Sequence, residues 1–253
     1  MRKILVTLLF ISVAPVAFAS GSEHIELKKV NWAFEGPAGR FDEQAVQRGF
    51  QVYKEVCAAC HGLKRVAFRN LTEIGLSEAE VKALASSYTV TDGPNEVGDM
   101  FDRPGRPSDR LPSPYPNALA AAAANGGAAP PDLSLIIKAR GDGANYLYSL
   151  LTGYSDEVPE GVTIPEGRHY NKYFPGHAIS MPKPITDGQV TYIDGTEATT
   201  EQMAKDVASF LQWAAEPEMQ ARKQTGIKAI IFLLVFTAFF YVAKKRIWSR
   251  IGQ

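Results

Sequence analysis

Residues that bind metal ions or form disulfide bridges are scarce in this sequence. Its 253 residues include two cysteines and four histidines. A structural zinc site needs four ligands in two paired clusters, and no second Cys or His pair exists, so a structural zinc site is excluded. No internal repeat is visible, so the chain is not an array of repeating units.

Acidic residues are absent from both ends of the chain. Residues 1–19 and 226–253 contain Lys and Arg but no Asp or Glu. The zero formal net charge therefore hides a division, because the part between them carries 27 acidic against 20 basic residues, or −7. An acidic surface favours a basic partner through electrostatic steering, although it also aids solubility. We expect no nucleic-acid partner.

Both cysteines lie in one motif, Cys57-Ala-Ala-Cys60-His61. A C-x-x-C-H run is the attachment signature of a c-type haem. On one turn at a helix end, two thiols can form thioethers to the haem vinyl groups while the adjacent imidazole meets the iron. A thioredoxin-like pair would need a βαβ setting, and the sequence before Cys57 is helical. The motif predicts one covalent haem c with His61 as the proximal ligand.

The N-terminus has the pattern of a secretory signal. Arg2 and Lys3 precede an apolar run from Ile4 to Phe18, which ends in an A-x-A site before Ser20. An uncleaved anchor helix is the alternative, but Pro15 and the short apolar length argue against it. We predict a signal peptide over 1–19 and export of the rest. A Sec-like signal favours a bacterium over a mitochondrion.

A second apolar segment runs from Gly226 to Ala243, interrupted by Lys228 near its start. Its 18 residues would span roughly 27 Å as a helix, close to the hydrocarbon core of a lipid bilayer. A buried core helix is the alternative, but basic flanks are unusual there. We predict a transmembrane anchor over 222–243 and, by the positive-inside rule, a cytoplasmic basic tail over 244–253.

The exported part, residues 20–221, is long enough for one domain with its own core. Its capping and apolar patterns predict a mostly α fold with long Pro- and Gly-rich loops. Helices are expected over 42–56, from Ser77, over 117–124, over 142–151 and from Thr199 to before Pro217. The last of these should pack near the first.

Two further segments give less regular patterns. Residues 91–116 are rich in Pro, Gly and Asp and should be irregular, with their apolar side chains packed on something large such as a haem. Those side chains are Met100, Phe101, Leu111 and Tyr115. Val190 to Ile193 followed by Asp194-Gly195 suggests a small hairpin.

The iron needs a second axial ligand opposite His61. Met203 lies in a helical apolar stripe, which favours core packing. His24, Met219 and Lys223 lie too close to the ends of the exported part. Composition leaves four candidates, which are Met100, Met181, His169 and His177.

Seven motifs follow one another in an order that is more specific than C-x-x-C-H alone. They are Cys57-Ala-Ala-Cys-His61-Gly, Met100-Phe-Asp-Arg-Pro-Gly105, Pro130-Pro-Asp-Leu-Ser134, Ala139-Arg140, Tyr146-Leu-Tyr-Ser-Leu-Leu-Thr-Gly-Tyr154, Tyr173-Phe-Pro-Gly176 with Met181-Pro182, and Lys205-Asp-Val with Phe210-Leu-Gln-Trp-Ala-Ala-Glu-Pro217. The set closely resembles the cytochrome c1 family over nearly the whole exported part and the anchor.

The resemblance implies roles for individual residues. Met181 would be the sixth iron ligand, with His177 as a rival four residues earlier. A thioether is a weak donor that raises the haem potential relative to a second imidazole. Arg140 and Tyr146 would hold a haem propionate. Asn125, Pro130 and Pro131 would form the pocket wall.

The resemblance also implies a function in respiratory or photosynthetic electron transport. The chain would be a subunit of a membrane quinol:cytochrome c oxidoreductase in the bacterial inner membrane, with its haem domain in the periplasm. It would take electrons from a Rieske iron–sulfur protein, pass them to a soluble or tethered c-type cytochrome, and sit beside cytochrome b. No residue is expected to do acid–base catalysis. The alternatives are a stand-alone membrane-anchored carrier that serves a terminal oxidase, and an anchored docking module with a structural haem.

Overall fold

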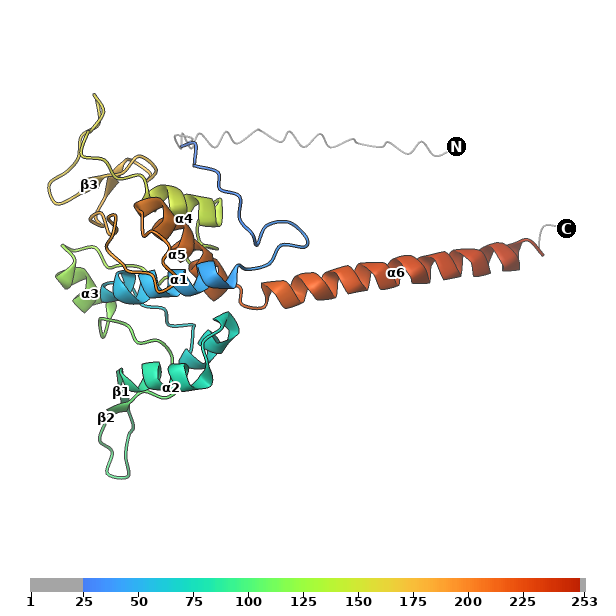
Figure 1. Ribbon diagram of the computed structural model, residues 1–253, viewed down its shortest axis with the longest axis horizontal. Coiled ribbons are helices and arrows are strands. Elements are labelled where there is room, and N and C mark those ends of the chain that lie inside the picture. Colours follow the sequence, from blue (N-terminus) through green and yellow to red (C-terminus); the bar gives the residue numbers. More distant parts are fainter. Residues whose placement is uncertain (1–24, 251–253) are drawn as a thin grey trace, which may run out of the picture.

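The computed structural model describes residues 25–250 and consists mainly of helices joined by long loops (Figure 1). The predicted signal peptide over 1–19 lies outside the described residues. The main helices are α1 Glu43–Glu55, α2 Glu78–Ser86, α3 Ala118–Ala124, α4 Gly143–Leu151, α5 Thr200–Ala215 and α6 Met219–Trp248. Two 3-10 helices, η1 Cys57–Ala59 and η2 Phe68–Ile74, lie between α1 and α2. The prediction of a mostly α fold is confirmed.

Helices α1 and α5 lie side by side at the centre of the head domain, which is the described part of the chain before α6, residues 25–218 (Figure 1). Gly49 of α1 lets the two backbones meet, because a Cβ there would lie 2.0 Å from the Asp206 carbonyl oxygen. Beside this crossing the Phe210 ring packs on Phe50 and Tyr53, with centroids 5.5 Å and 5.7 Å apart. Met203 is fully buried in the same core, as its place in an apolar stripe predicted.

Side-chain caps fix where these helices begin. Asp42 accepts hydrogen bonds from the amides of the first turn of α1, and Asn117 and Thr199 do the same for α3 and α5. Ser77 and Glu80 form a reciprocal capping box at the start of α2. Such caps satisfy amides that have no partner within the helix, which is why the sequence located these four starts correctly.

The segment 91–116 is more regular than predicted. Strand β1, Thr89–Asp92, pairs antiparallel with β2, Phe101–Pro104, to form a hairpin that projects from the head domain (Figure 1). The Met100 and Phe101 side chains are 60% and 44% exposed, so these two are not packed down as expected, whereas Leu111 is buried. Arg103 fixes the base of the hairpin by pairing with Asp92 and with Asp109, at 2.5 Å and 2.6 Å.

The small hairpin predicted over 190–195 is wrong. Residues 193 and 194 form a turn without strand pairing, and the Asp194 carboxylate instead accepts a hydrogen bond from Arg48 of α1 at 2.8 Å. The same guanidinium pairs with the fully buried Asp206 of α5. In place of strand pairing, the ion pair between Asp194 and Arg48 holds this turn against α1. The second two-stranded sheet lies elsewhere, between β3, His169–Tyr170, and β4, Ala178–Ile179.

An N-terminal strap, residues 25–41, is hydrogen-bonded to α4 through its first half. The Lys28 amide donates to the Ser149 hydroxyl at 2.9 Å. The buried Asn145 side-chain oxygen accepts from the Val30 amide and from the Trp32 indole. Polar side chains on one side of α4 thus accept hydrogen bonds from the strap, which has no strand partner.

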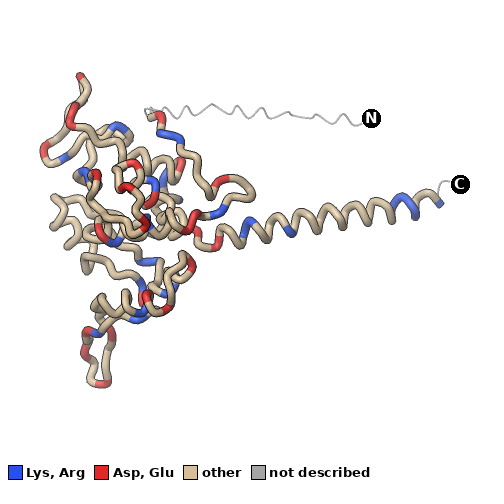
Figure 2. The backbone as a smooth tube through the Cα atoms, in the orientation of Figure 1, with Lys and Arg blue, Asp and Glu red and all other residues tan. Residues whose placement is uncertain are grey.

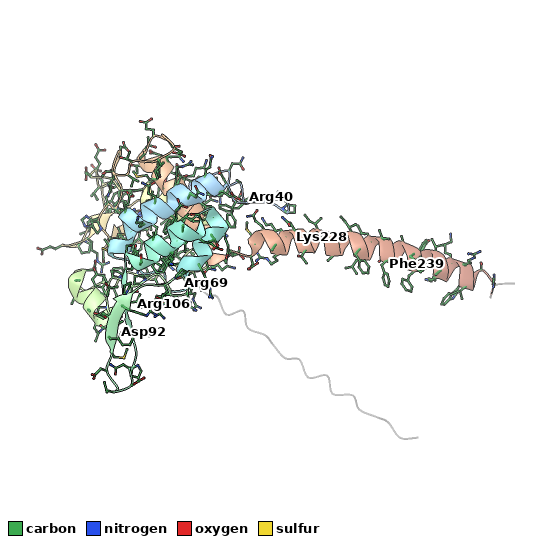
Figure 3. All side chains as sticks on the ribbon, turned by 60° about the horizontal axis from the view of Figure 1, so that its bottom comes forward. Arg40, Arg69, Asp92, Arg106, Lys228 and Phe239 are labelled. Atoms are coloured by element: carbon green, nitrogen blue, oxygen red, sulfur yellow. The ribbon has the colours of Figure 1, made fainter. Side chains whose placement is uncertain are left out.

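Helix α6 leaves the head domain as a single long rod (Figure 1). It is long and apolar enough to cross a membrane, with a mean hydropathy of 2.2 over its most apolar window, none of which is buried. Charged residues lie near its two ends and not in its middle (Figure 2), and labelled side chains such as Lys228 and Phe239 stand away from its axis (Figure 3). The predicted C-terminal helix is confirmed and begins a few residues earlier than its apolar run.

The joint between α5 and α6 is held by several contacts. Glu216 accepts from Lys138 at 2.6 Å and from Arg222 at 2.9 Å. The Lys223 ammonium donates to the Phe34 carbonyl of the strap at 2.5 Å. Met219, the first residue of α6, is 3% exposed. These contacts tie the base of the rod to the head domain.

Candidate haem site

The C-x-x-C-H motif forms one tight turn directly after α1. Helix α1 ends at Glu55, and η1 continues over Cys57–Ala59. The Cys57 carbonyl accepts from the Cys60 amide at 3.1 Å and from the His61 amide at 2.8 Å. The Tyr53 hydroxyl donates to the His61 carbonyl at 3.1 Å. Two thiols and an imidazole are thereby held on a single turn at a helix end, as the motif predicted.

The two thiols differ in their surroundings. Cys57 is half-buried against the core, and burial raises the pKa of its thiol to about 12. Cys60 is exposed, and neither cysteine is in a disulfide. Because the thiolate is the reactive form of cysteine, a raised pKa does not suit a redox dithiol.

The His61 ring is oriented by a backbone carbonyl. Its Nδ1 lies 2.7 Å from the Pro131 oxygen and donates to it, because a carbonyl can only accept. Burial lowers the pKa of His61, while the Pro131 bond and the Asp132 carboxylate oppose that shift. A neutral ring protonated on Nδ1 keeps its Nε2 lone pair available for a metal.

The chain that follows His61 is joined to the segment that holds Pro131. The Leu133 amide donates to the Gly62 carbonyl at 2.9 Å, and the Lys64 amide donates to the Asp132 carboxylate at 3.0 Å. Gly62 lets the Asp132 carboxylate and the Ser113 hydroxyl lie close to its backbone, because a Cβ there would be 3.2 Å and 2.4 Å from their oxygen atoms. Residues 61–65 and 131–134 therefore form one unit around the imidazole.

Met181 lies on a loop and touches the same core. Its side chain is partly buried and packs against the hydrophobic cluster that also contacts Cys57 and Ala58. Its carbonyl oxygen accepts a hydrogen bond from the Tyr154 hydroxyl at 3.0 Å. Burial raises the pKa of the Tyr154 phenol, so the hydroxyl stays protonated and remains a donor.

His177, the rival ligand, belongs to a different environment. Its ring lies 5.9 Å from that of Tyr170, and its Nδ1 is 3.3 Å from the Asn171 carbonyl. It lines a hollow of about 490 Å³ together with Lys28 of the N-terminal strap and Tyr173. Its backbone has a φ of 58°, which is uncommon for residues other than glycine. These contacts account for His177 as a turn residue facing the strap.

Arg140 and Tyr146 lie close to one another where α4 begins. The Arg140 guanidinium is exposed and lowers the pKa of the Tyr146 phenol, although burial is the larger effect and raises it overall. Asn125 lies at the end of α3, where its side chain donates to the Ala121 carbonyl at 2.7 Å. Pro130 and Pro131 come directly before Asp132. Of these two prolines, Pro131 contacts His61 directly, through its carbonyl.

The donor set fits a haem better than a metal ion held by the protein alone. Within residues 25–250, no group of three or more His, Cys, Asp or Glu side chains could hold a metal ion. One oriented imidazole, two adjacent thiols and a partly buried thioether are the groups that attach and ligate haem c. The phenol and guanidinium at α4 are donors of the kind that bind a carboxylate.

Sequence reasoning missed three contributors to this site. The sequence predicts Pro131 only as part of the pocket wall, and it assigns no role to Asp132 or Tyr154. Asp132 had a local signal, since an Asp two residues before a Ser is typical of an Asx turn. Tyr154 had none, because its partner is 27 residues away.

Comparison with known proteins gives a family and several relatives. The profile of the Cytochrome C1 family matches residues 32–251. Cytochrome c1 of Rhodospirillum rubrum is 52% identical over 239 residues, covering 88% of each chain. "Cytochrome c1, heme protein, mitochondrial" of Saccharomyces cerevisiae is 48% identical, covering 95% of this chain and 78% of the relative. "Cytochrome b/c1" of Bradyrhizobium diazoefficiens is 56% identical, covering 86% of this chain but 35% of the longer relative.

Proposed function

We propose, from the premise that this chain belongs to the cytochrome c1 family, that it is the electron-transfer subunit of a membrane quinol:cytochrome c oxidoreductase. In this proposal it carries one covalently attached haem c. The name of the yeast relative supports a haem, and the name of the Bradyrhizobium relative supports an assembly with cytochrome b. The observation that carries the proposal is the His61 ring, oriented by Pro131 beside two free thiols.

The C-x-x-C-H motif and Met181 would hold the haem in this proposal, each residue through a different bond. When bound, the haem supplies one-electron iron chemistry. Cys57 and Cys60 would attach it through thioethers, and His61 would ligate its iron through Nε2. Met181 would supply a thioether ligand, a soft and weak donor that favours the ferrous state and so a high potential. No side chain is required to transfer a proton.

Other residues orient the group and close its surroundings. Arg140 and Tyr146 hold a propionate between a charged and a neutral donor, which fits their proximity at α4. Asn125 and Pro131 form part of the pocket wall. Pro131 also keeps the His61 ring from rotating, because its carbonyl fixes Nδ1.

Electrons enter from a Rieske iron–sulfur protein and leave to a soluble or tethered c-type cytochrome. The net charge of −7 on the part between the two apolar ends supports a basic acceptor. Acidic residues on and beside the projecting hairpin offer one place for it (Figure 2). Co-purification with a b-type cytochrome supports this assignment, whereas isolation of the chain alone, in active form, supports a stand-alone carrier.

The proposed topology follows the division of the chain. Residues 1–19 are removed, 20–221 fold in the periplasm, 222–243 span the bacterial inner membrane, and 244–253 stay in the cytoplasm. Protease added to spheroplasts should cut the exposed hairpin and spare a C-terminal tag. A protected head domain with a digested tag would reverse this orientation.

Covalent attachment is the decisive test of the proposed function. Wild-type protein run under denaturing conditions should keep haem on the polypeptide. Cys57→Ala and Cys60→Ala should each weaken the attachment, and the double variant should abolish it. A Met203→Leu variant is the matched control, because this buried methionine belongs to the core. Haem that is fully extractable from the wild-type protein would refute the proposal.

A further inference from the structure

The Met181 loop has little regular structure to hold it. The short β3–β4 pairing ends at Ile179, and Pro182 and Pro184 have no amide hydrogen to donate. In the described part of the chain, the hydrogen-bond partner found for the backbone of residues 180–185 is the Tyr154 hydroxyl, 3.0 Å from the Met181 carbonyl. The Met181 carbonyl oxygen is two bonds from the Cα that carries the thioether side chain.

We propose that Tyr154 is the positioning residue that holds Met181 in place as the axial ligand. The inference rests on the proposed function, since it takes Met181 to be the sixth ligand. By fixing the Met181 carbonyl, the hydroxyl restricts the backbone torsions at that residue and so the direction of its side chain. The bond thereby shifts the equilibrium of the loop toward the conformation that ligates.

Tyr154 is itself held in place at the end of α4. It forms an antiparallel bridge with Asn171, and the Lys172 amide donates to the Gly153 carbonyl at 3.0 Å. The Gly153 position admits no side chain, because a Cβ there would lie 2.4 Å from the Tyr173 ring and 2.8 Å from the Ser149 carbonyl. The backbone that carries Tyr154 is therefore packed tightly against the helix.

The start of the Met181 loop is tied to the same place by Asn171. This residue is fully buried, and its side-chain amide donates to the Leu150 carbonyl at 2.7 Å while its side-chain oxygen accepts from the Tyr173 amide at 3.0 Å. Its own amide donates to the His177 carbonyl at 2.9 Å. Asn171 thus fixes where the loop begins, and Tyr154 fixes it at the ligand.

The test is Tyr154→Phe in the full-length, haem-loaded protein, which removes one oxygen atom. Tyr170→Phe is the matched control, because that tyrosine lies in β3, just before the loop that carries Met181, while the hydroxyl found to hydrogen-bond the Met181 carbonyl in the described residues is that of Tyr154. Exogenous imidazole competes with the methionine for ferric iron, so its apparent affinity reports how often the ligand opens. Tyr154→Phe should tighten imidazole binding about tenfold, the equivalent of about 1.4 kcal/mol. The sulfur-to-iron charge-transfer absorption should weaken in parallel.

A double-variant cycle separates this role from a structural one. In a Met181→Leu background, Tyr154→Phe should have no further effect on imidazole affinity, since there is no ligand left to position. An effect that persists there, or no effect in the wild-type background, overturns the proposal. Failure of Tyr154→Phe to accumulate while Tyr170→Phe accumulates also overturns it, because the hydroxyl would then serve folding. If Met181→Leu alone leaves imidazole binding and the absorption unchanged, the ligand assignment of the proposed function fails instead.

Discussion

The His61 side and the Met181 side of the site are built in different ways. His61 lies one residue after Cys60, on a turn whose own backbone hydrogen bonds hold it, and its ring is fixed by a bond of 2.7 Å to Pro131. Met181 lies 120 residues further along, on a loop, and the bond that holds it there reaches its carbonyl and not its side chain. One proposed ligand is fixed at its ring, and the other is fixed through its backbone.

This difference has a physical consequence for how each side responds to damage. On the His61 side, the proposed covalent attachment and a hydrogen-bonded ring leave few alternative conformations. On the Met181 side, the thioether depends on a flexible side chain and on contacts between distant segments. Local opening is expected to begin in segments with few such contacts. We therefore expect the Met181 side to open first.

Removing the thioether is the strongest way to test this asymmetry. Met181→Leu should keep the haem attached, because both thioethers to cysteine remain, but should open the sixth position. Carbon monoxide binding should change from undetectable to stoichiometric, and the reduction potential should fall. Met181→His or Met181→Lys should also lower the potential, since a stronger donor favours ferric iron.

The control for this prediction is His177→Asn, because asparagine tolerates the positive φ found there. It should leave the spectrum almost unchanged. Carbon monoxide binding to the His177 variant but not to Met181→Leu would exchange the two assignments, while the covalent haem would stand.

Alanine substitutions at two glycines, one on each side of the site, should have smaller effects on stability, and the two effects should differ in size. A Cβ at Gly153 would meet the Ser149 carbonyl and the Tyr173 ring, so Gly153→Ala should cost about 1–3 kcal/mol of stability. A Cβ at Gly62 would meet the Ser113 hydroxyl, which can rotate away, so Gly62→Ala should cost under about 1 kcal/mol. Thermal unfolding of the haem-loaded variants measures both, and a reversed order would contradict the packing described.

Acid should loosen the projecting hairpin before either side of the haem site. The Arg103 guanidinium lowers the pKa of Asp109 to about 2 and also lowers that of Asp92. Because the folded-state pKa lies below the ordinary value, this stabilisation is present above about pH 4 and is lost as the pH falls toward 2. Pepsin cleavage near the exposed Phe101 should therefore accelerate over that range, relative to an unfolded peptide of the same sequence.

Arg103→Gln is the matched variant for the acid experiment. It removes the partner of both carboxylates, so cleavage should already be fast at pH 4 and should change little on further acidification. Equal pH profiles for the variant and the wild-type protein would show that the ion pairs do not hold the hairpin.

The smallest expected effect concerns docking of the electron acceptor. Asp92 is paired with Arg103, so Glu96 and Asp99 at the hairpin tip are better candidates for attracting a basic cytochrome (Figure 3 shows where Asp92 lies). Glu96→Gln with Asp99→Asn should slow electron transfer a few-fold at low salt and have little effect at high salt. Glu160→Gln, on another exposed loop, is the control. A salt-insensitive rate in the wild-type protein would indicate an apolar dock or a tethered partner.

Much of the fold could be predicted because its signals are local. The capping residues Asp42, Ser77, Asn117 and Thr199 each act within one turn, so the sequence locates the helices they begin. The predicted hairpin over 190–195 failed because Asp194 pairs with Arg48, a contact between distant segments. The hairpin over 89–104 was missed because Pro, Gly and Asp in its turn conceal two short strands.

The same distinction between local and long-range contacts decides which residues of the candidate site the sequence can predict. The C-x-x-C-H run gives its attachment residues directly, since all three groups lie on one turn. The family resemblance predicts Met181 as the second ligand. Without the resemblance, the sequence leaves four loop residues as candidates, and Met181 is one of them. Tyr154 and the Pro131 carbonyl act across 27 and 70 residues of sequence, so only the folded chain brings them to their partners.

The contacts at the joint between α5 and α6 hold the head domain in one orientation relative to α6. Glu216, Lys223 and the buried Met219 each tie the base of the rod to a different part of the head. If α6 spans a membrane, the height and tilt of the proposed haem above the surface are set by the helix. A proposed electron partner would then have to move toward the haem, and the rate of that movement would limit the rate of electron transfer.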